Sequence, residues 1–207
     1  MSKELIKTVK QYSLPLSDEE MEMLERTGKA FRNCRNYFFS RFHGIRSIAR
    51  FENGRKLRDS LMNKNLANIA RMPARYWKIA LVQVLGNLKT LLENVKLKIR
   101  KASFNNSNLS DSDRHYINSI LKYESYLSNV LNFKKLDKYI YEKHNVNFRR
   151  LNSLIRRYYR RYRGKIPYSH KTNFLQLDAR MYRYEKGMIA ISTVKKGRRI
   201  PVILQEI

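Results

Sequence analysis

The sequence predicts an α+β fold in which a small β-barrel is interrupted by a long helical insertion. Two observations lead to this prediction. Segments of alternating apolar and polar residues occur at residues 3–14 and again after Gly164, whereas the stretch between them carries apolar residues at helical spacings. The 207 residues, of which 43% are hydrophobic and 12% aromatic, are enough to bury a core and argue against wholesale disorder.

The N-terminal strand is predicted to lead directly into a helix. Residues 3–14 alternate as a strand does, and Pro15 ends the pattern. Ser17 and Glu20 have the spacing of a capping box, in which each side chain accepts a hydrogen bond from the other residue's backbone N–H. The apolar positions that follow predict a long amphipathic helix that ends near His43-Gly44.

Helices should fill most of the following stretch of about 120 residues, up to Gly164. Asn53-Gly54 predicts a turn, and Pro73 suits the first turn of a helix with an apolar stripe from Trp77 to Val95. The polar composition of residues 103–113 predicts a loop. Further helices are predicted over residues 56–69, over residues 116–131, at Tyr139 and Ile140, and over the arginine-rich stretch before Gly164.

Four short β-type segments complete the predicted sheet. Gly187 and Gly197 stand where tight hairpins need glycine, and Pro201 argues for an edge position of its strand. With the N-terminal strand there are five, the number in an oligonucleotide-binding-type β-barrel. The four segments are residues 173–177, 180–184, 189–194 and 199–204. We therefore expect residues 1–16 and 165–207 to form the barrel, and residues 17–164 to form a helical lobe.

Charge is the most unusual property of the chain. Its 44 Lys and Arg residues against 17 Asp and Glu residues leave a formal net charge of +27. A compact chain with so much like charge repels itself unless a polyanion neutralises it, so nucleic acid is the leading partner. The longest apolar stretch, IALVQVL, is far too short to span a membrane, so we expect no membrane association.

The remaining compositional features predict an ordinary intracellular protein. The N-terminus lacks the apolar segment of a secretion signal, and we expect a cytoplasmic location. The single cysteine, Cys34, has no second thiol to pair with and is predicted to be a half-buried helix residue.

The segment RRYYRRYR at residues 156–163 is the first candidate for contact with a polyanion. On a helical wheel Tyr158 and Tyr162 fall among the apolar residues, Tyr159 lies near the border, and the arginines occupy the opposite arc. Most of the aromatic side chains are therefore expected in the core and not on the surface as platforms for base stacking.

The arginines of this helix lack the compensation that a solvated helix face normally has. Opposite charges four residues apart stabilise such a face, yet no acidic residue lies between Glu142 and Asp178. The planar fork of arginine also suits phosphate. The predicted nucleic-acid-binding residues, which extend from the helix onto the barrel rim, are Arg149, Arg150, Arg156, Arg157, Arg160, Arg161, Arg163, Lys165, Tyr168, Lys171, Arg180, Arg183, Lys195, Lys196, Arg198 and Arg199.

Signals for catalysis are weaker. The histidines, at positions 43, 115, 144 and 170, include no i, i+4 metal pair. Metal-free RNA cleavage by His170 with Lys171 or Lys165 needs only a base and a cation, but one such pair is a weak signal. We predict a noncatalytic protein without a metal or cofactor. The acids considered for two-metal hydrolysis form no recognisable set: Asp111, Asp113, Asp178, Glu185 and Glu206.

Several stretches resemble the N-terminal half of the TnpB transposon-encoded RNA-guided nucleases and of the related type V CRISPR effectors. In that family a first barrel strand leads into a helical recognition lobe, and the chain then completes a barrel called the wedge domain. Gln83 to Leu88 is similar to the family's Q-x-x-L-x-x-L-type helix, whereas residues 100–150 match little. The similar stretches are SLPLSDEEMEMLERTGKAFRNCRNYFF, RYWKIALVQVLGNLKTLLENVK, GKIPYSHKTNFLQL and GMIAISTVKKGRRIPVIL.

The sequence departs from the family at its C-terminal end. Family members continue into a RuvC-like nuclease domain with catalytic acids and a C-x-x-C zinc ribbon, whereas this sequence stops at Ile207, where that domain would begin. The resemblance therefore implies no catalytic residue here. It implies binding of the scaffold of a structured guide RNA, and by extension of a guide–target DNA duplex. Three interpretations stay open: the chain serves a separate RuvC-type nuclease chain, acts alone as an RNA-dependent DNA binder, or is a degraded relic.

Two alternatives remain open. The charge also fits a stand-alone DNA-binding regulator or recombinase accessory. The resemblance also fits an interaction protein that mimics the RNA-binding half and thereby inhibits an effector.

Overall fold

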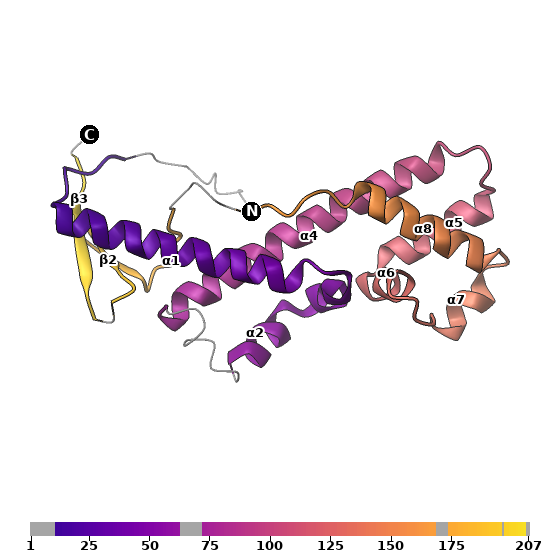
Figure 1. Ribbon diagram of the computed structural model, residues 1–207, viewed down its shortest axis with the longest axis horizontal. Helices are drawn as coiled ribbons and strands as arrows, with labels where there is room; N and C mark the ends of the chain where they lie inside the picture. Colours follow the sequence, from indigo (N-terminus) through magenta and orange to yellow (C-terminus); the bar gives the residue numbers. More distant parts are fainter. Residues whose placement is uncertain (1–10, 63–71, 169–173, 196, 206–207) are drawn as a thin grey trace, which may run out of the picture.

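A computed structural model describes residues 11–62, 72–168, 174–195 and 197–205. The molecule is elongated, with a small antiparallel sheet at one end and a cluster of helices at the other (Figure 1). Two long helices, α1 (Asp18–Phe42) and α4 (Ala74–Phe104), form the body between them. The expected α+β composition is confirmed.

The order of the shorter helices follows the prediction, with two corrections. The helix expected over residues 116–131 is broken at Tyr123, whose extended backbone (φ −117°, ψ 135°) separates α5 from α6. The expected loop at residues 103–113 is shorter, because α4 continues to Phe104 and a capping box of Ser110 with Asp113 starts α5. The elements are η1 (Ile45–Asn53), α2 (Gly54–Met62), α5 (Asp111–Lys122), α6 (Glu124–Leu131), α7 (Lys138–Lys143) and α8 (Phe148–Tyr162).

Helix α1 begins and ends where the sequence predicts. The capping box of Ser17 and Glu20 is present, and His43 caps the C-terminus. Aromatic side chains join α1 to the start of α4: the ring centroids of Phe31 and Tyr76 lie 6.1 Å apart in an edge-on arrangement. Cys34 is buried in the core and not half-buried as predicted, and burial raises the pKa of its thiol to about 12, as for an unreactive core residue.

The predicted turn at Asn53-Gly54 is wrong. This dipeptide is the junction at which the 3₁₀ helix η1 continues into α2. Ile48, Phe51 and Leu57 are all buried, and burying them on one side requires helical spacing through the junction. Residues 63–69, the remainder of the helix predicted there, lie outside the described residues.

The sheet has the order β1-β2-β3, with every pair antiparallel. Its strands are β1 (Tyr182–Glu185), β2 (Met188–Ser192) and β3 (Arg199–Ile203). The predicted first hairpin is confirmed: Lys186 and Gly187 have φ of 37° and 78°, as the two-residue turn of a twisted hairpin requires. Pro201 lies in β3, at the edge of the three-stranded sheet, as expected.

The described residues do not show the predicted five-stranded barrel. The sheet is open, and residues 12–14 add only a bridge at the outer edge of β3, where the Leu14 N–H donates to the Ile203 carbonyl at 2.8 Å. Residues 174–177 form no strand, because Leu175 and Leu177 pack against the helical core. Residues 3–10 of the predicted first strand lie outside the described residues.

The C-terminus of α6 has an unusual residue in its cap. The N–H of Lys134 donates to the Asn129 carbonyl and the N–H of Phe133 to the Val130 carbonyl, the paired bonds of a Schellman motif. The residue that turns the chain in this motif adopts the left-handed conformation and is usually glycine. Here it is Phe133, with φ 58°, at a cost of about 1 kcal/mol for its β-carbon.

A buried ion pair fastens the middle of α4 to α6. The Lys96 side chain is only 2% exposed, and its Nζ donates to carboxylate oxygens of Glu93 at 2.8 Å and Glu124 at 3.2 Å. Glu124 is mostly buried, so it depends on Lys96 for neutralisation.

We predict that Lys96→Ala destabilises the protein by about 3 kcal/mol, because it leaves the Glu124 carboxylate buried without its cation. Urea unfolding followed by circular dichroism measures this change. Lys138→Ala is the matched control, since the Lys138–Glu142 pair is exposed and its loss should change the unfolding free energy little. Equal losses for the two variants would contradict the prediction.

Candidate nucleic-acid interface

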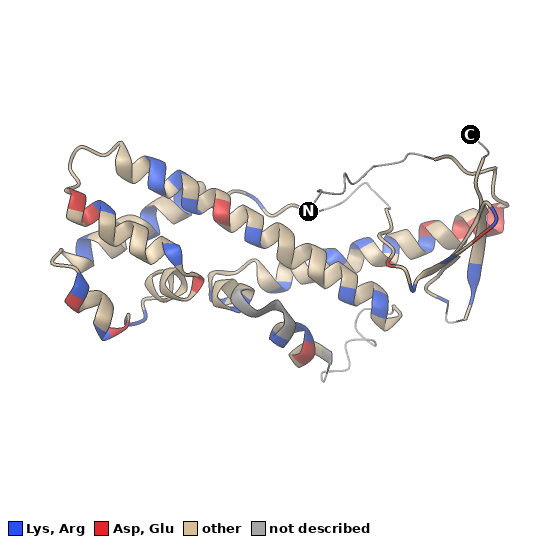
Figure 2. Ribbon diagram, turned by 180° about the vertical axis from the view of Figure 1, so that it is seen from behind, with Lys and Arg blue, Asp and Glu red and all other residues tan. Residues whose placement is uncertain are grey.

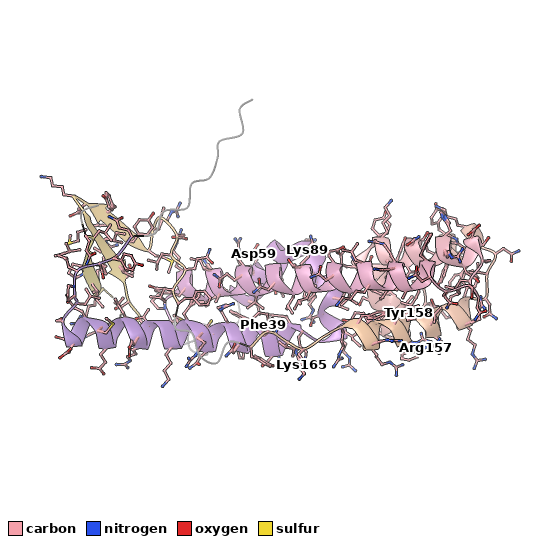
Figure 3. All side chains as sticks on the ribbon, turned by 90° about the horizontal axis from the view of Figure 1, so that it is seen from above. Phe39, Asp59, Lys89, Arg157, Tyr158 and Lys165 are labelled. Carbon is pink, nitrogen blue, oxygen red and sulfur yellow. The ribbon has the colours of Figure 1, made fainter. Side chains whose placement is uncertain are left out.

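Helix α8 carries six of the sixteen predicted binding residues. The Asn147 side chain accepts from the Arg150 N–H and caps the helix, and Leu151, Leu154 and Ile155 bury its inner face. In Figure 3 Tyr158 lies between α8 and α4, while Arg157 lies on the far side of α8. The amphipathic pattern therefore sends the apolar residues inward and leaves arginines outside.

The prediction for the three tyrosines is partly wrong. Tyr159, which the helical wheel places at the border, is the most buried of them, whereas Tyr158 and Tyr162 are half-buried at the edge of the core. The reason is that α8 packs against both α4 and α6, which moves the buried arc toward Tyr159. Burial raises the pKa of the Tyr159 hydroxyl.

Two arginines of α8 have structural partners. Arg150 donates to the carboxylate of Asp113. Arg156 donates to the Val130 carbonyl at 3.2 Å, and its guanidinium lies 4.3 Å from the ring centroid of Phe133. These contacts hold α8 against α5 and α6, so both arginines contribute to the fold as well as to the charge.

The other cations of α8 and of the segment after it form what we call the cationic strip. All of them are exposed, and none forms an ion pair with an acid within the described parts of the chain. These arginines therefore lack the nearby acidic side chains that compensate the cations of an ordinary protein surface. The members of the cationic strip are Arg149, Arg157, Arg160, Arg161, Arg163 and Lys165.

A groove of about 420 Å³ lies at the end of the strip. Its floor is apolar, from α4 and η1, and Tyr159, Arg163, Lys165 and Tyr168 contribute polar groups around it. The hydroxyl of Tyr168 lies 3.1 Å from that of Ser40 in α1, which positions the segment after Gly164. The apolar residues are Ile48, Phe51, Leu88, Leu91, Leu92, Val95 and Ile166.

The predicted cations of the sheet form a second, separate group. Tyr76, near the start of α4, donates to the Ser192 carbonyl of β2, while Asn106, just after the end of α4, donates to the Tyr158 hydroxyl of α8. At 1.5 Å per helical residue these contacts are about 45 Å apart. The end of the cationic strip lies nearer the sheet, because Arg163 and Lys165 line the groove together with Leu88 in the middle of α4. The expectation that one basic surface runs from the helix onto the sheet stays a prediction.

The sheet end is also less basic than predicted. Figure 2 shows acidic residues gathered at the start of α1, beside the sheet. Arg198 is neutralised there by an ion pair with Glu19, and the backbone N–H of Arg180 donates to the Asp178 carboxylate. The predicted cations that are exposed at this end are Arg180, Arg183, Lys195 and Arg199, whereas Lys171 and Lys196 lie outside the described residues.

The described residues provide no cluster of three or more metal-ligating side chains. Two of the acids considered for hydrolysis have structural uses, because Asp113 pairs with Arg150 and Asp178 with Arg75. Among the described helices none is long and apolar enough to cross a membrane.

The fold does bring two distant histidines together, which the sequence spacing does not reveal. The rings of His115 and His144 have centroids 5.1 Å apart, and the buried Nε2 of His144 has no hydrogen-bond partner among the described residues. Burial, followed by the nearby charges of His115 and Lys143, lowers the pKa of His144.

Comparisons with protein-family models, curated proteins and solved structures find no match to this chain.

We predict that acid destabilises the helical end through His144. Because its folded-state pKa lies below the unfolded value of 6.5, the unfolded chain binds a proton first as pH falls, and stability is lost below about pH 6.5. Thermal melting at pH 7.5 and pH 5.5 measures the loss. The non-titrating variant His144→Gln should lose less stability over this range than the unsubstituted protein, and an equal loss in both would contradict the assignment.

Proposed function

We propose that this chain is a noncatalytic nucleic-acid-binding protein that holds the scaffold of a structured, guide-type RNA. The cationic strip carries the proposal: its six side chains are exposed and have no acidic partner among the described residues. Like charges along one helix destabilise it, so the arrangement is costly for a protein that never meets a polyanion.

The dimensions of α8 support contact with a nucleic-acid backbone. Its 15 residues give a length of about 22 Å, enough to reach several successive phosphates of one strand. The arginine fork binds phosphate oxygens in pairs, and contacts of this kind recognise the shape of an RNA helix without reading its sequence. The strip therefore suits a folded RNA scaffold.

The second group of cations extends the proposed contact. Arg183 and Arg199 are exposed on the sheet, which Tyr76 joins to the start of α4, whereas the strip extends from the end of α4 to its middle. A folded RNA that lies along the elongated molecule reaches both ends, whereas a short oligonucleotide reaches one. The acids at the start of α1 limit the RNA path near the sheet, because phosphate avoids them.

The resemblance to TnpB-like nucleases and type V effectors sharpens the proposal. In this interpretation residues 17–164 are the recognition lobe, and residues 1–16 with 165–207 are a wedge-type barrel that closes with a strand from the N-terminal residues. The chain acts in the cytoplasm and serves a separate RuvC-type nuclease chain. A guide–target DNA duplex is a further ligand of the same surface.

Replacing Arg157, Arg160 and Arg163 together with glutamine should weaken RNA binding and flatten its salt dependence. Each lost phosphate contact reduces the slope of log affinity against log salt by about 0.7 to 0.9, so the expected change is about 2. Fluorescence anisotropy with a structured RNA between low and moderate salt measures it. Melting temperature should not fall, because none of the three has an acidic partner in the described chain.

A control variant removes the same charge elsewhere. Lys29, Lys98 and Lys101 are exposed on α1 and α4, outside the strip, and their replacement by glutamine lowers the net charge equally. This control should change the slope much less. If both triple variants have the same slope, binding depends on overall charge alone and the strip is an ordinary solvated face.

The identity of the RNA has its own test. The protein expressed in its natural host should co-purify with one discrete structured RNA, which sequencing of the bound fraction identifies. A random mixture of RNAs would refute the guide-scaffold proposal. A preferred duplex DNA sequence would instead identify a DNA-binding regulator, and binding to an effector's guide RNA or protein with loss of its activity would identify an inhibitor.

A further inference from the structure

Phe133 occupies a position in which phenylalanine is rare. It is the left-handed residue of the Schellman motif after α6, with φ 58°, where glycine or asparagine avoids the clash of a β-carbon. Its side chain is 76% exposed, so burial of the ring does not offset this backbone cost. The conformation and the exposure together indicate that the ring is kept for a contact outside the folded chain.

One face of the Phe133 ring is already covered. The guanidinium of Arg156 lies 4.3 Å from the ring centroid, and Arg156 is itself held by the Val130 carbonyl at 3.2 Å. Because the ring is nevertheless mostly exposed, its other face is open to solvent. A flat apolar face backed by a fixed cation is the arrangement that stacks a nucleobase.

The charges around the ring favour an anionic ligand. Lys134 and Lys135 follow Phe133 directly and are exposed. Arg149, Arg156, Arg160 and Arg163 share one side of α8, because their spacings of seven, four and three residues return to the same helix face. A base on Phe133 therefore has its phosphates near Arg156 and Lys134, with Arg149 and Arg160 of the strip on the same side of α8.

We propose that Phe133 is a stacking platform for an unpaired base of the bound RNA, such as a bulged or loop nucleotide. The open face of the ring takes the base, Arg156 supports the opposite face, and the neighbouring cations hold the flanking phosphates. The inference rests on the proposed function and adds a requirement to it: the RNA must present an unstacked base next to a duplex that lies on α8.

An apolar partner protein is the competing occupant, and the surroundings disfavour it. Arg156 contacts the ring, and Lys134 and Lys135 follow it in the chain, whereas the same loop holds one exposed acid, Asp137. An apolar interface would have to desolvate these charges. Nucleic acid supplies both the flat ring and the compensating negative charge.

The test uses the full chain and two hairpin RNAs, one with a single bulged 2-aminopurine and one that is fully paired. We expect the protein to bind the bulged hairpin about tenfold more tightly and to quench its fluorescence, because stacking on an aromatic ring adds to the phosphate contacts. Phe133→Asn should abolish both the preference and the quenching. Its melting temperature should change little, because asparagine tolerates the left-handed conformation and this gain offsets the lost contact with Arg156.

The chain offers a matched control in Phe104, which is 75% exposed and has the Arg114 guanidinium 5.9 Å from its ring centroid. Phe104 is the last residue of α4 and does not have a positive φ. Phe104→Asn should keep the preference for the bulged hairpin. Phe133→Trp, which retains a flat ring, should keep it as well.

The outcomes separate the two proposals. If the unsubstituted protein binds neither hairpin nor any other structured RNA, the proposed function fails. If it binds RNA and Phe133→Asn keeps the full preference and quenching, the platform is overturned while the function stands. A clear fall in melting temperature for Phe133→Asn would show that the ring serves the fold, and it would also overturn the platform.

Discussion

The packing of α4 is the constraint on which the rest of the structure depends. This one helix buries side chains along its whole length, from Tyr76 and Trp77 near its start to Ile99 near its end. Its first half meets α1 and the sheet, and its second half meets α5 and α8. Because a helix of 31 residues is about 46 Å long, the elements at its two ends lie far apart.

The distribution of the few acidic residues follows from this arrangement. Asp113, Glu124 and Asp178 pair with cations across element boundaries, where they join α5 to α8, α6 to α4, and the segment before the sheet to α4. Five more acidic residues lie together in residues 18–25. Three of them are in the first turn of α1, where the positive end of the helix dipole stabilises their charge. Acidic residues thus stabilise the fold at specific positions and leave the outer face of α8 uncompensated.

Stability and proposed function oppose each other at that face. The cationic strip brings like charges together, and Phe133 takes a backbone conformation that its side chain disfavours. Both features lie on or beside α8 and cost folding free energy, and the Phe133 ring gains only its contact with Arg156 in return. A bound polyanion with an unstacked base offsets both costs, which is why the two proposals are linked.

Local signals in the sequence were sufficient for several elements. The Ser17–Glu20 capping box and the hairpin at Lys186-Gly187 were predicted because each depends on residues within a few positions of one another. The arginine-rich outer face of α8 was predicted for the same reason, since helical spacing alone separates Leu151 from Arg160.

Other features depended on partners distant in the chain. Tyr159 is buried because α8 has two neighbours, and residues 174–177 leave the sheet because Leu175 and Leu177 find the helical core. The approach of His115 to His144 and of Arg156 to Phe133 is set by how helices meet. The sequence by itself determined most of the helices, the first hairpin and the excess charge, because these are local or compositional. Only the tertiary structure decided which cations are neutralised, which remain free for a ligand, and how far apart the two basic groups lie, because packing along α4 sets those distances.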